Sequence, residues 1–276
     1  MSVSNSPFVK KYFRQEMMPH IWCPGCGNGI IMRDIAKAIE KNNLKRDEVV
    51  IVSGIGCSGR AAGYMDFNTI HTTHGRAIPV ATGIKMARRD LEVIVITGDG
   101  DSTAIGGNHF IHAARRNIDL TVVVFNNSIY GMTGGQYSPT TPKGEMGTTA
   151  PYGSVDQDFD VCKLAIAAGA TFVGRGTVFH TPQTIKLIER GINHKGFSVI
   201  DCVSICPTYY GRKNKKGDAV EMMQWIKDNT INHEQAQSMF AEEVKDKIIM
   251  GLIYHNVRPE YCSQYQELIE RSRKED

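Results

Sequence analysis

The chain has 276 residues, 41% of them hydrophobic and 22% charged, with a formal net charge of +3. This composition suits a globular protein of one large or two small domains, and so weak a charge gives no reason to expect nucleic acid or a membrane surface as partner. Because we find no signal-peptide-like start and no apolar run near the about 18 residues of a spanning helix, we expect a cytoplasmic location.

Short β-rich runs alternate with segments of helical spacing along most of the chain. The runs predict strands at 49–54, 92–98, 120–127, 171–176 and 197–203. The segments between them predict helices at 78–90, 104–117, 160–170 and 181–194. Continuous apolar strands separated by helices predict an α/β fold, a mainly parallel sheet flanked by helices on both faces. Ligands of such sheets bind beyond the carboxyl ends of the strands.

The composition changes from about residue 211. The stretch GRKNKKGD (211–218) predicts a basic loop, and the charged segments at 219–229 and 233–253 have helical spacing. The stretch after 257 is polar. We therefore predict an α/β domain over 1–217 and a helical C-terminal extension over 218–276, which packs on the domain or on a partner subunit.

Two polar motifs stand at the ends of neighbouring strands. GDGD (98–101) ends one predicted strand and opens a helix, and NN (126–127) ends the next strand. One right-handed strand–helix–strand unit then places Asp99 and Asn127 at the same edge of the sheet. Their carboxylate and amide oxygens can hold Mg²⁺, which takes its other ligands from phosphates. The glycines let the backbone approach a ligand and the helix start offers N–H groups to a diphosphate, whereas a bare Gly-Asp-Gly would be only a tight turn.

Four of the seven cysteines are expected to meet at that edge. Cys23 and Cys26 form a C-x-x-C pair, which suits a redox dithiol, a zinc site or an iron–sulfur cluster. No strand precedes the pair as a thioredoxin-like fold requires. Cys57 follows the first predicted strand and Cys206 follows the last, so both lie at the ligand edge. Such spacing predicts a site assembled by the fold rather than a local zinc ribbon.

The remaining cysteines have simpler interpretations. Cys202 is the rival of Cys206, but it sits inside an apolar strand, where its side chain should meet the core. Cys162 and Cys262 fall in helical or tail segments and are expected to behave as ordinary hydrophobic residues.

The ordered motifs between about residues 10 and 215 resemble one protein family. WCPGCG, GIGCSGR, HGRAIPVATG, GDGD, NNSIYGMTGGQ and CPTYYGR together resemble the β subunits of 2-oxoacid:ferredoxin oxidoreductases, most of all those that act on 2-oxoglutarate. The resemblance implies a thiamine diphosphate-binding domain of the diphosphate type, with Mg²⁺ and one [4Fe–4S] cluster. The implied cluster ligands are Cys23, Cys26, Cys57 and Cys206. The implied Mg²⁺ ligands are Asp99, Asn127 and the backbone carbonyl of Ile129.

The resemblance also assigns residues around the cofactor and the substrate. It implies that His74 contacts the cofactor and that Arg60 binds the 2-oxoacid carboxylate, which a guanidinium can grip with two hydrogen bonds. The other residues implied to line the cofactor are Ile55, Gly56, Cys57, Ser58, Gly98, Gly100, Asp101, Gly131 and Met132. One position departs from the pattern, because some relatives carry lysine in LTKGQ where this chain has Gly134.

The implied activity needs a second protein. The family converts a 2-oxoacid, CoA and oxidised ferredoxin to acyl-CoA, CO₂ and reduced ferredoxin, in either direction. Thiamine catalysis also needs a glutamate on a pyrimidine-binding domain, and nothing before Asp99 predicts such a domain. We therefore expect half an active site, completed by an α subunit, with further small subunits and ferredoxin as other partners.

Several alternatives stay open. 2-Oxoglutarate is the first expected substrate, ahead of branched-chain 2-oxoacids such as 2-oxoisovalerate and then pyruvate. A non-oxidative thiamine decarboxylase or synthase half would need no cluster. A scaffold subunit would hold zinc in the cysteines and carry a vestigial GDG.

Overall fold

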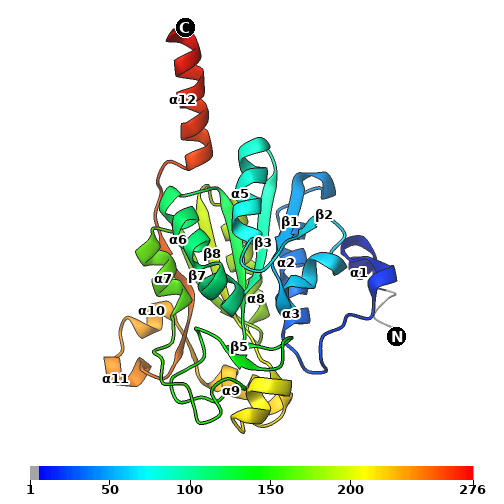
Figure 1. Cartoon of the computed structure of the whole chain (residues 1–276), viewed down its shortest axis with the longest axis vertical. Coiled ribbons are helices and arrows are strands. Elements are labelled where there is room, and N and C mark those ends of the chain that lie inside the picture. Colours follow the sequence, from blue (N-terminus) through cyan, green and yellow to red (C-terminus); the bar gives the residue numbers. More distant parts are fainter. Residues whose placement is uncertain (1–5, 276) are drawn as a thin grey trace.

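One large sheet forms the centre of the molecule (Figure 1). The computed structural model describes residues 6–275, and within this range eight strands form that sheet in the order β2-β1-β3-β4-β8-β7-β10-β9. All neighbours pair in parallel except β10 with β7. The strands are β1 (Val49–Ser53), β2 (Asn68–His71), β3 (Glu92–Gly98), β4 (Leu120–Asn126), β7 (Phe172–Thr177), β8 (Phe197–Val203), β9 (Thr230–Asn232) and β10 (Ile248–His255).

Helices cover both faces of this sheet. The main ones are α2 (Asn28–Lys41), α5 (Ala77–Ala87), α6 (Gly107–Arg116), α7 (Val161–Ala168) and α8 (Thr181–Asn193). Alternate residues of a strand point to opposite faces. Ile51 accordingly belongs to the buried cluster under α2 and α8, while Val50 and Val52 belong to the cluster under α5, α6 and α7. The predicted α/β fold class is confirmed.

The predicted elements of the domain are all present. Each of the five predicted strands and four predicted helices is observed with ends shifted by at most a few residues. Two elements were not predicted, the helix α2 and the edge strand β2. The residues of β2 are mostly exposed and polar, so this strand gives no apolar signal. The shorter elements are α1 (Pro7–Tyr12), η2 (Gln15–Met17), η3 (Arg46–Glu48), α3 (Gly56–Gly59), α4 (Ala61–Tyr64), η4 (Asp101–Ile105), β5 (Ile129–Tyr130), β6 (Gln136–Tyr137) and η5 (Pro207–Gly211).

The C-terminal segment differs in part from its prediction. The helix predicted at 219–229 is α9 (Ala219–Asp228), but the helix predicted over 233–253 is wrong. That stretch contains the short helices α10 (His233–Ala236) and α11 (Ala241–Val244) and then β10. The run IIMGLIYH is rich in β-branched and aromatic residues, and its antiparallel pairing with β7 outweighs the helical spacing of its charges.

The last helix, α12 (Tyr261–Glu275), extends away from the body of the molecule (Figure 1). Its first N–H, from Tyr261, donates to the carbonyl of Asn117, which precedes β4. The helix therefore leaves from the amino end of β4, opposite the end at which ligands are expected. Whether the segment 218–276 packs on a partner subunit stays a prediction. Between residues 6 and 275, no helix has the length and apolar content needed to cross a membrane.

Candidate functional site

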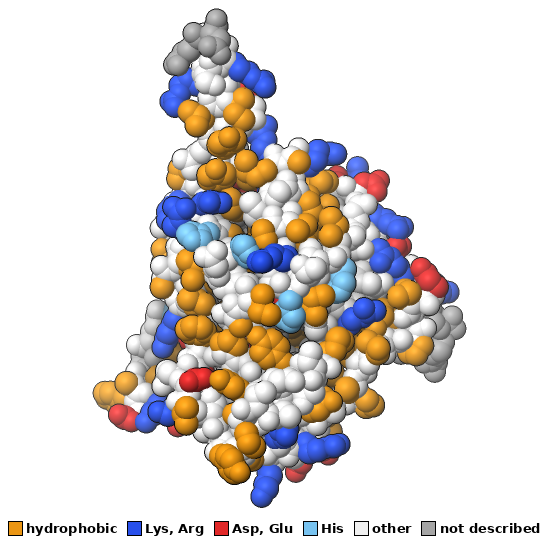
Figure 2. Space-filling model, in the orientation of Figure 1, with side chains coloured by type: hydrophobic (Ala, Val, Ile, Leu, Met, Phe, Trp, Pro, Cys, Tyr) orange, Lys and Arg blue, Asp and Glu red, His pale blue; other side chains and the backbone are white. Residues whose placement is uncertain are grey.

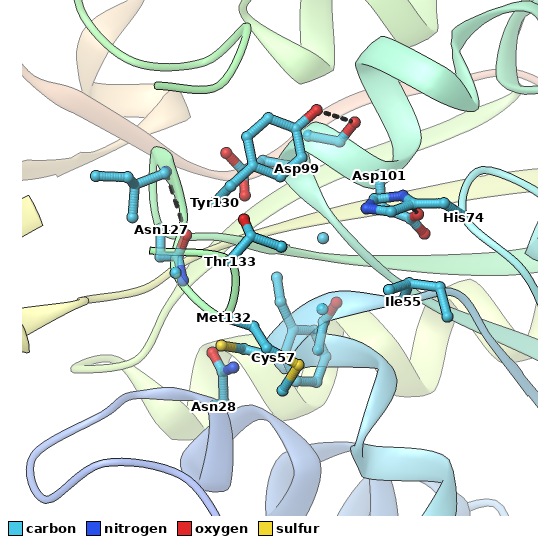
Figure 3. A pocket seen from close by; sticks show the side chains of 17 residues that line it. Asn28, Ile55, Cys57, His74, Asp99, Asp101, Asn127, Tyr130, Met132 and Thr133 are labelled. Atoms are coloured by element: carbon cyan, nitrogen blue, oxygen red, sulfur yellow. Dashed lines mark hydrogen bonds and ion pairs between the residues drawn. The ribbon is translucent and has the colours of Figure 1, made fainter. Parts of the chain in front are cut away.

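A pocket lies at the carboxyl ends of β1, β3 and β4 (Figure 3). The predicted residues that line it are Ile55, Gly56, Cys57, Ser58, His74, Gly98, Asp99, Gly100, Asp101, Asn127, Ile129, Gly131 and Met132. The sequence analysis missed Asn28, Phe125, Tyr130 and Thr133, which line it too. The parallel sheet explains this convergence, because its strand ends meet at one edge.

The carboxylate of Asp99 is buried in the wall of this pocket. One of its oxygens, Oδ2, accepts hydrogen bonds from the hydroxyls of Ser138 (2.5 Å) and Thr140 (2.6 Å). Burial raises the pKa of Asp99 to about 6, and the two hydroxyls act in the opposite direction. A buried carboxylate is costly unless a positive charge faces it, so this group fits a cation ligand. The sequence analysis did not identify the two hydroxyl donors.

Asn127 stands in a sharp turn after β4. β3 and β4 are neighbours in the sheet, which brings Asp99 and Asn127 to the same pocket as predicted. Ser128 has a left-handed backbone (φ 57°), and the N–H of Ile129 donates to Asn127 Oδ1 at 3.3 Å. The hydroxyl of Thr141 donates to the carbonyl of Ser128 at 2.6 Å and holds the turn from outside.

A glycine is required at position 100 because a neighbouring side chain leaves no room for a Cβ, and not because of its backbone conformation. Its φ of −70° is open to any residue, but a Cβ there would lie 2.2 Å from Tyr130 Cζ. The Tyr130 hydroxyl donates to the carbonyl of Gly100 at 3.0 Å. Burial, then the charges of Asp99 and Asp101, raises the pKa of Tyr130 to about 12, so the hydroxyl keeps its proton. Tyr130 thus closes over the GDGD turn.

Asp101 supports His74 from beneath. Asp101 Oδ1 accepts from the N–H of Gly75 (2.8 Å), and Oδ2 accepts from the hydroxyl of Thr97 (2.9 Å). His74 Nδ1 lies against the same carboxylate. These contacts attach the loop that carries His74 to the end of β3. Asp101 lines the pocket as predicted, and its oxygens are already engaged within the chain.

The thiols of Cys57 and Cys206 lie side by side below the pocket. A Cβ on Gly131 would be 3.4 Å from Cys57 Sγ and 3.7 Å from Cys206 Sγ. Burial raises the pKa of Cys57 to about 11, and the charges of Cys206 and Cys23 add to the shift. Burial likewise raises the pKa of Cys26 to about 12, with further contributions from the other three. The geometry therefore places Cys57 and Cys206 next to each other, with Cys23 and Cys26 on the loop that approaches them.

Three chain segments are tied together around these thiols. Trp22 Nε1 donates to the carbonyl of Cys57 at 2.7 Å, so a buried tryptophan attaches the C-x-x-C loop to the segment after β1. The N–H of Gly27 donates to the carbonyl of Ile205 at 3.4 Å and joins the loop to the segment before Cys206. The motif WCPGCG contains this tryptophan, but the sequence alone does not predict the contact.

Backbone N–H groups oppose part of the effect of burial on these thiols. The N–H of Asn28 lowers the pKa of Cys26, that of Met132 lowers the pKa of Cys57, and those of Tyr209 and Tyr210 lower the pKa of Cys206, whereas burial raises all three. These N–H groups favour the thiolate, which is the form that binds metals. In the described part of the chain, no three His, Cys, Asp or Glu side chains are grouped so as to hold one metal ion. The metal assignments therefore stay predictions.

The other cysteines lie elsewhere. Cys202 is fully buried in the core below α2 and α8. Cys162 lies in the opposite core cluster, and Cys262 Sγ is 3.6 Å from Met86 Sδ.

Arg60 lies outside the pocket lining, between α3 and α4. Its Nε is buried without a hydrogen-bond partner, and within residues 6–275 it forms no ion pair with an acidic side chain. Because no acidic side chain of the described residues neutralises this guanidinium, it can still bind a carboxylate. Gly134, at the position of the relatives' lysine, has φ 113° in the turn between β5 and β6.

Comparison with known proteins identifies the family. Residues 54–202 match the family described as thiamine pyrophosphate enzyme, C-terminal TPP binding domain. The 2-oxoglutarate synthase subunit KorB of Methanocaldococcus jannaschii is 54% identical over 265 residues, which cover 96% of this chain and 98% of that protein. The chain belongs to the 2-oxoacid:ferredoxin oxidoreductase β subunits. A further member, the β subunit from Saccharolobus solfataricus, is 39% identical over 91% of this chain and 86% of that protein.

A solved structure shares the fold of this β subunit. It is described as 2-oxoglutarate:ferredoxin oxidoreductase from Magnetococcus marinus with 2-oxoglutarate, coenzyme A and succinyl-CoA bound. Its TM-score is 0.85 at 32% identity, over 95% of this chain and 90% of that chain. The predictions of an oxidoreductase subunit and of a thiamine diphosphate-binding domain are therefore confirmed.

The fit of Tyr130 over Gly100 predicts the effect of one methyl group. Gly100→Ala should displace the tyrosine ring, weaken thiamine diphosphate binding in calorimetry and lower the free energy of unfolding by about 1–3 kcal/mol. Gly107→Ala is the matched control, because a Cβ there meets nothing within 4 Å. In a Tyr130→Ala background, Gly100→Ala should cost much less stability, because the clashing ring is absent. Equal effects of Gly100→Ala and Gly107→Ala would contradict this packing argument.

Proposed function

We propose that this chain is the thiamine diphosphate- and [4Fe–4S]-bearing β subunit of a 2-oxoglutarate:ferredoxin oxidoreductase. The reaction joins 2-oxoglutarate and CoA to give succinyl-CoA, CO₂ and a proton, while two electrons reduce oxidised ferredoxin, and it runs in either direction. We infer a cytoplasmic location. The observation that carries the proposal is the position of Cys57 and Cys206 beside the thiamine diphosphate pocket, with the C-x-x-C loop tied to the same segments by Trp22 and Gly27, because non-oxidative thiamine chemistry needs no redox centre there.

The pocket residues suit thiamine diphosphate held through Mg²⁺. Asp99, Asn127 and the carbonyl of Ile129 would bind the ion, with Ser138 and Thr140 orienting the aspartate. Gly98, Gly100, Gly131 and Met132 would line the diphosphate, and Ile55, Gly56, Cys57, Ser58 and Asp101 complete the proposed lining. When bound, thiamine diphosphate supplies the electron sink for decarboxylation. His74, oriented by Asp101, would contact the cofactor, and Arg60 would hold the 2-oxoacid carboxylate.

The four thiols suit a [4Fe–4S] cluster. Cys23, Cys26, Cys57 and Cys206 would be its ligands, and the N–H groups directed at the buried sulfurs would stabilise the thiolates. Cys57 lines the cofactor pocket itself, so the cluster would stand next to the site of decarboxylation. This position suits electron transfer from the cofactor to ferredoxin.

An α subunit should cover the pocket. Met132, which lines the pocket, is 47% exposed, and Ile105, which packs on the loop of His74, is 53% exposed. Figure 2 shows hydrophobic side chains gathered across the middle of the molecule in this orientation. Exposed apolar side chains around a site are typical of a surface that another protein covers. The proposed occupant carries the pyrimidine-binding domain and its glutamate.

The substrate assignment rests on the relatives and on charge. The Magnetococcus marinus structure holds 2-oxoglutarate, and the Methanocaldococcus jannaschii relative is named 2-oxoglutarate synthase. The second carboxylate of 2-oxoglutarate must meet a cation or several donors, because burying it unpaired costs several kcal/mol. With Gly134 at the position of the lysine and Arg60 on the first carboxylate, a group of the α subunit would meet the second.

The first test of this proposal concerns the cluster ligands. Cys206→Ser should remove iron, sulfide and the brown colour from the anaerobically purified complex, because one ligand is lost. Cys202→Ser, four residues earlier in the chain and buried in the core, should keep them. Iron and sulfide analysis with visible absorption measures both. A colourless complex that contains zinc would favour the scaffold alternative, and one with neither metal would favour the non-oxidative thiamine enzyme.

The second test concerns the partner. The isolated chain should not reduce viologen with any 2-oxoacid, and adding the α subunit should restore activity. Ile105→Asp should prevent assembly, measured by size-exclusion chromatography, because it places a charge in the covered surface. Val257→Asp, at a position that is 79% exposed on the C-terminal segment, is the matched control and should assemble normally. Turnover by the verified single chain would refute the half-site interpretation.

The third test concerns the substrate. The assembled complex should show its highest kcat/KM on 2-oxoglutarate, above 2-oxoisovalerate and pyruvate. Arg60→Ala should lower kcat/KM for all three by about 10- to 100-fold, since a lost hydrogen bond to a charged group is worth about 1.5–3 kcal/mol. Arg60→Lys should recover only part of the loss. A preference for 2-oxoisovalerate would contradict the substrate, and a loss confined to 2-oxoglutarate would move Arg60 to the second carboxylate.

A further inference from the structure

A chain of polar contacts runs from the turn of Asn127 back into the sheet. Asn126 Nδ2 donates to Asp201 Oδ1 at 3.0 Å, and Arg175 Nε donates to Asp201 Oδ2 at 2.8 Å. Arg175 Nη2 then donates to Asp160 Oδ1 at 2.6 Å. Asn126, Asp201 and Arg175 come from the neighbouring strands β4, β8 and β7. Asp201 is 1% exposed, and both of its oxygens are occupied.

These contacts determine how the Asn126 amide is oriented. Its Nδ2 can donate and its Oδ1 can only accept, so binding Nδ2 to Asp201 turns Oδ1 toward the N–H of Ser128. That N–H donates to Asn126 Oδ1 at 3.4 Å. Ser128 is the residue with φ 57°, a conformation that residues other than glycine seldom adopt without support. Asn126 therefore helps to hold the left-handed residue in place.

The turn in question carries two of the proposed Mg²⁺ ligands. Asn127 lines the cofactor pocket and also a second cavity, which Asn126, Asp201 and Arg175 line as well. We propose that Asp201 is a positioning residue for the metal: through Asn126 it sets the turn that presents the Asn127 side chain and the Ile129 carbonyl. This inference rests on the proposed function, because it assumes that Mg²⁺ binds there.

Arg175 makes this arrangement possible. A carboxylate as buried as that of Asp201 needs a charged partner, and Arg175 supplies one in direct contact. Asp160 fixes the other end of the guanidinium, and it also caps α7 by accepting from the N–H groups of Cys162 and Lys163. The orientation of Asp201 is thus anchored to a helix outside the pocket.

The test is calorimetry of thiamine diphosphate binding to the assembled complex after cofactor and metal have been removed. With Mg²⁺, Asp201→Asn and Asn126→Ala should each weaken binding by about 10- to 100-fold, the usual effect of losing a group that orients a metal ligand. With Ca²⁺, which accepts irregular coordination, the loss should be smaller. The double variant should be no weaker than the poorer single variant, because both changes break the same contact.

Asp119→Asn is the matched control. Asp119 precedes the amino end of β4, is 7% exposed and pairs with Lys85 at 2.7 Å, so it is another buried ion pair next to the same strand. It should leave Mg²⁺-dependent binding within about twofold, and its effect should add to that of Asn126→Ala. Equal losses in Asp201→Asn and Asp119→Asn, or additivity of Asp201→Asn with Asn126→Ala, would overturn the positioning role.

Two further variants separate the possible failures. Asn126→Ala leaves the Asp201–Arg175 pair intact, so this variant tests the positioning role even if Asp201→Asn does not fold. Unchanged Mg²⁺-dependent affinity for thiamine diphosphate in Asn126→Ala would overturn the inference. Asp99→Ala tests the metal site itself. Unchanged binding in Asp99→Ala would remove the proposed Mg²⁺ site, whereas abolished binding there with normal binding in Asn126→Ala would overturn only the role of Asp201.

Discussion

The site depends on one buried carboxylate at the end of a central strand. Asp99 follows β3 directly, and Ser138 and Thr140 approach its Oδ2 from a loop that comes after the next strand. The proposed cation would offset the cost of burying this charge, and it would be the common partner of the loop, the strand end and the turn of Asn127. The hydrogen bond between Asn126 and Asp201 connects the turn of Asn127 to the neighbouring strand β8.

The cysteines at the pocket are also positioned by contacts between segments that are distant in the sequence. Cys57 and Cys206 flank Gly131, and Trp22 brings the C-x-x-C loop to the carbonyl of Cys57. Three segments distant in sequence therefore meet next to the pocket. The proposed cluster and the proposed cofactor would share Cys57 and Met132 as neighbours, which would give electrons a short path between them.

Sequence patterns were sufficient where the cause is local or follows from sheet topology. Alternating apolar strands and helices predicted the order of the domain, and right-handed crossover predicted that Asp99 and Asn127 share an edge. The pattern failed for β10, because its pairing with the edge of β7 decides the conformation of this segment rather than the spacing of its own residues. It also missed Tyr130, since no motif shows that an aromatic ring folds back over Gly100.

The sequence by itself determined the fold class and the family and predicted which polar and sulfur residues stand at one edge of the sheet, because these depend on residue type, on order along the chain and on the fixed hand of strand connections. Only the tertiary structure decided how these residues support one another. Asp101 holds the loop of His74, Tyr130 explains the glycine at 100, and Asp201 reaches the turn of Asn127 through Asn126. Such contacts join residues on different strands and loops, and their distances and directions exist only once the sheet has formed.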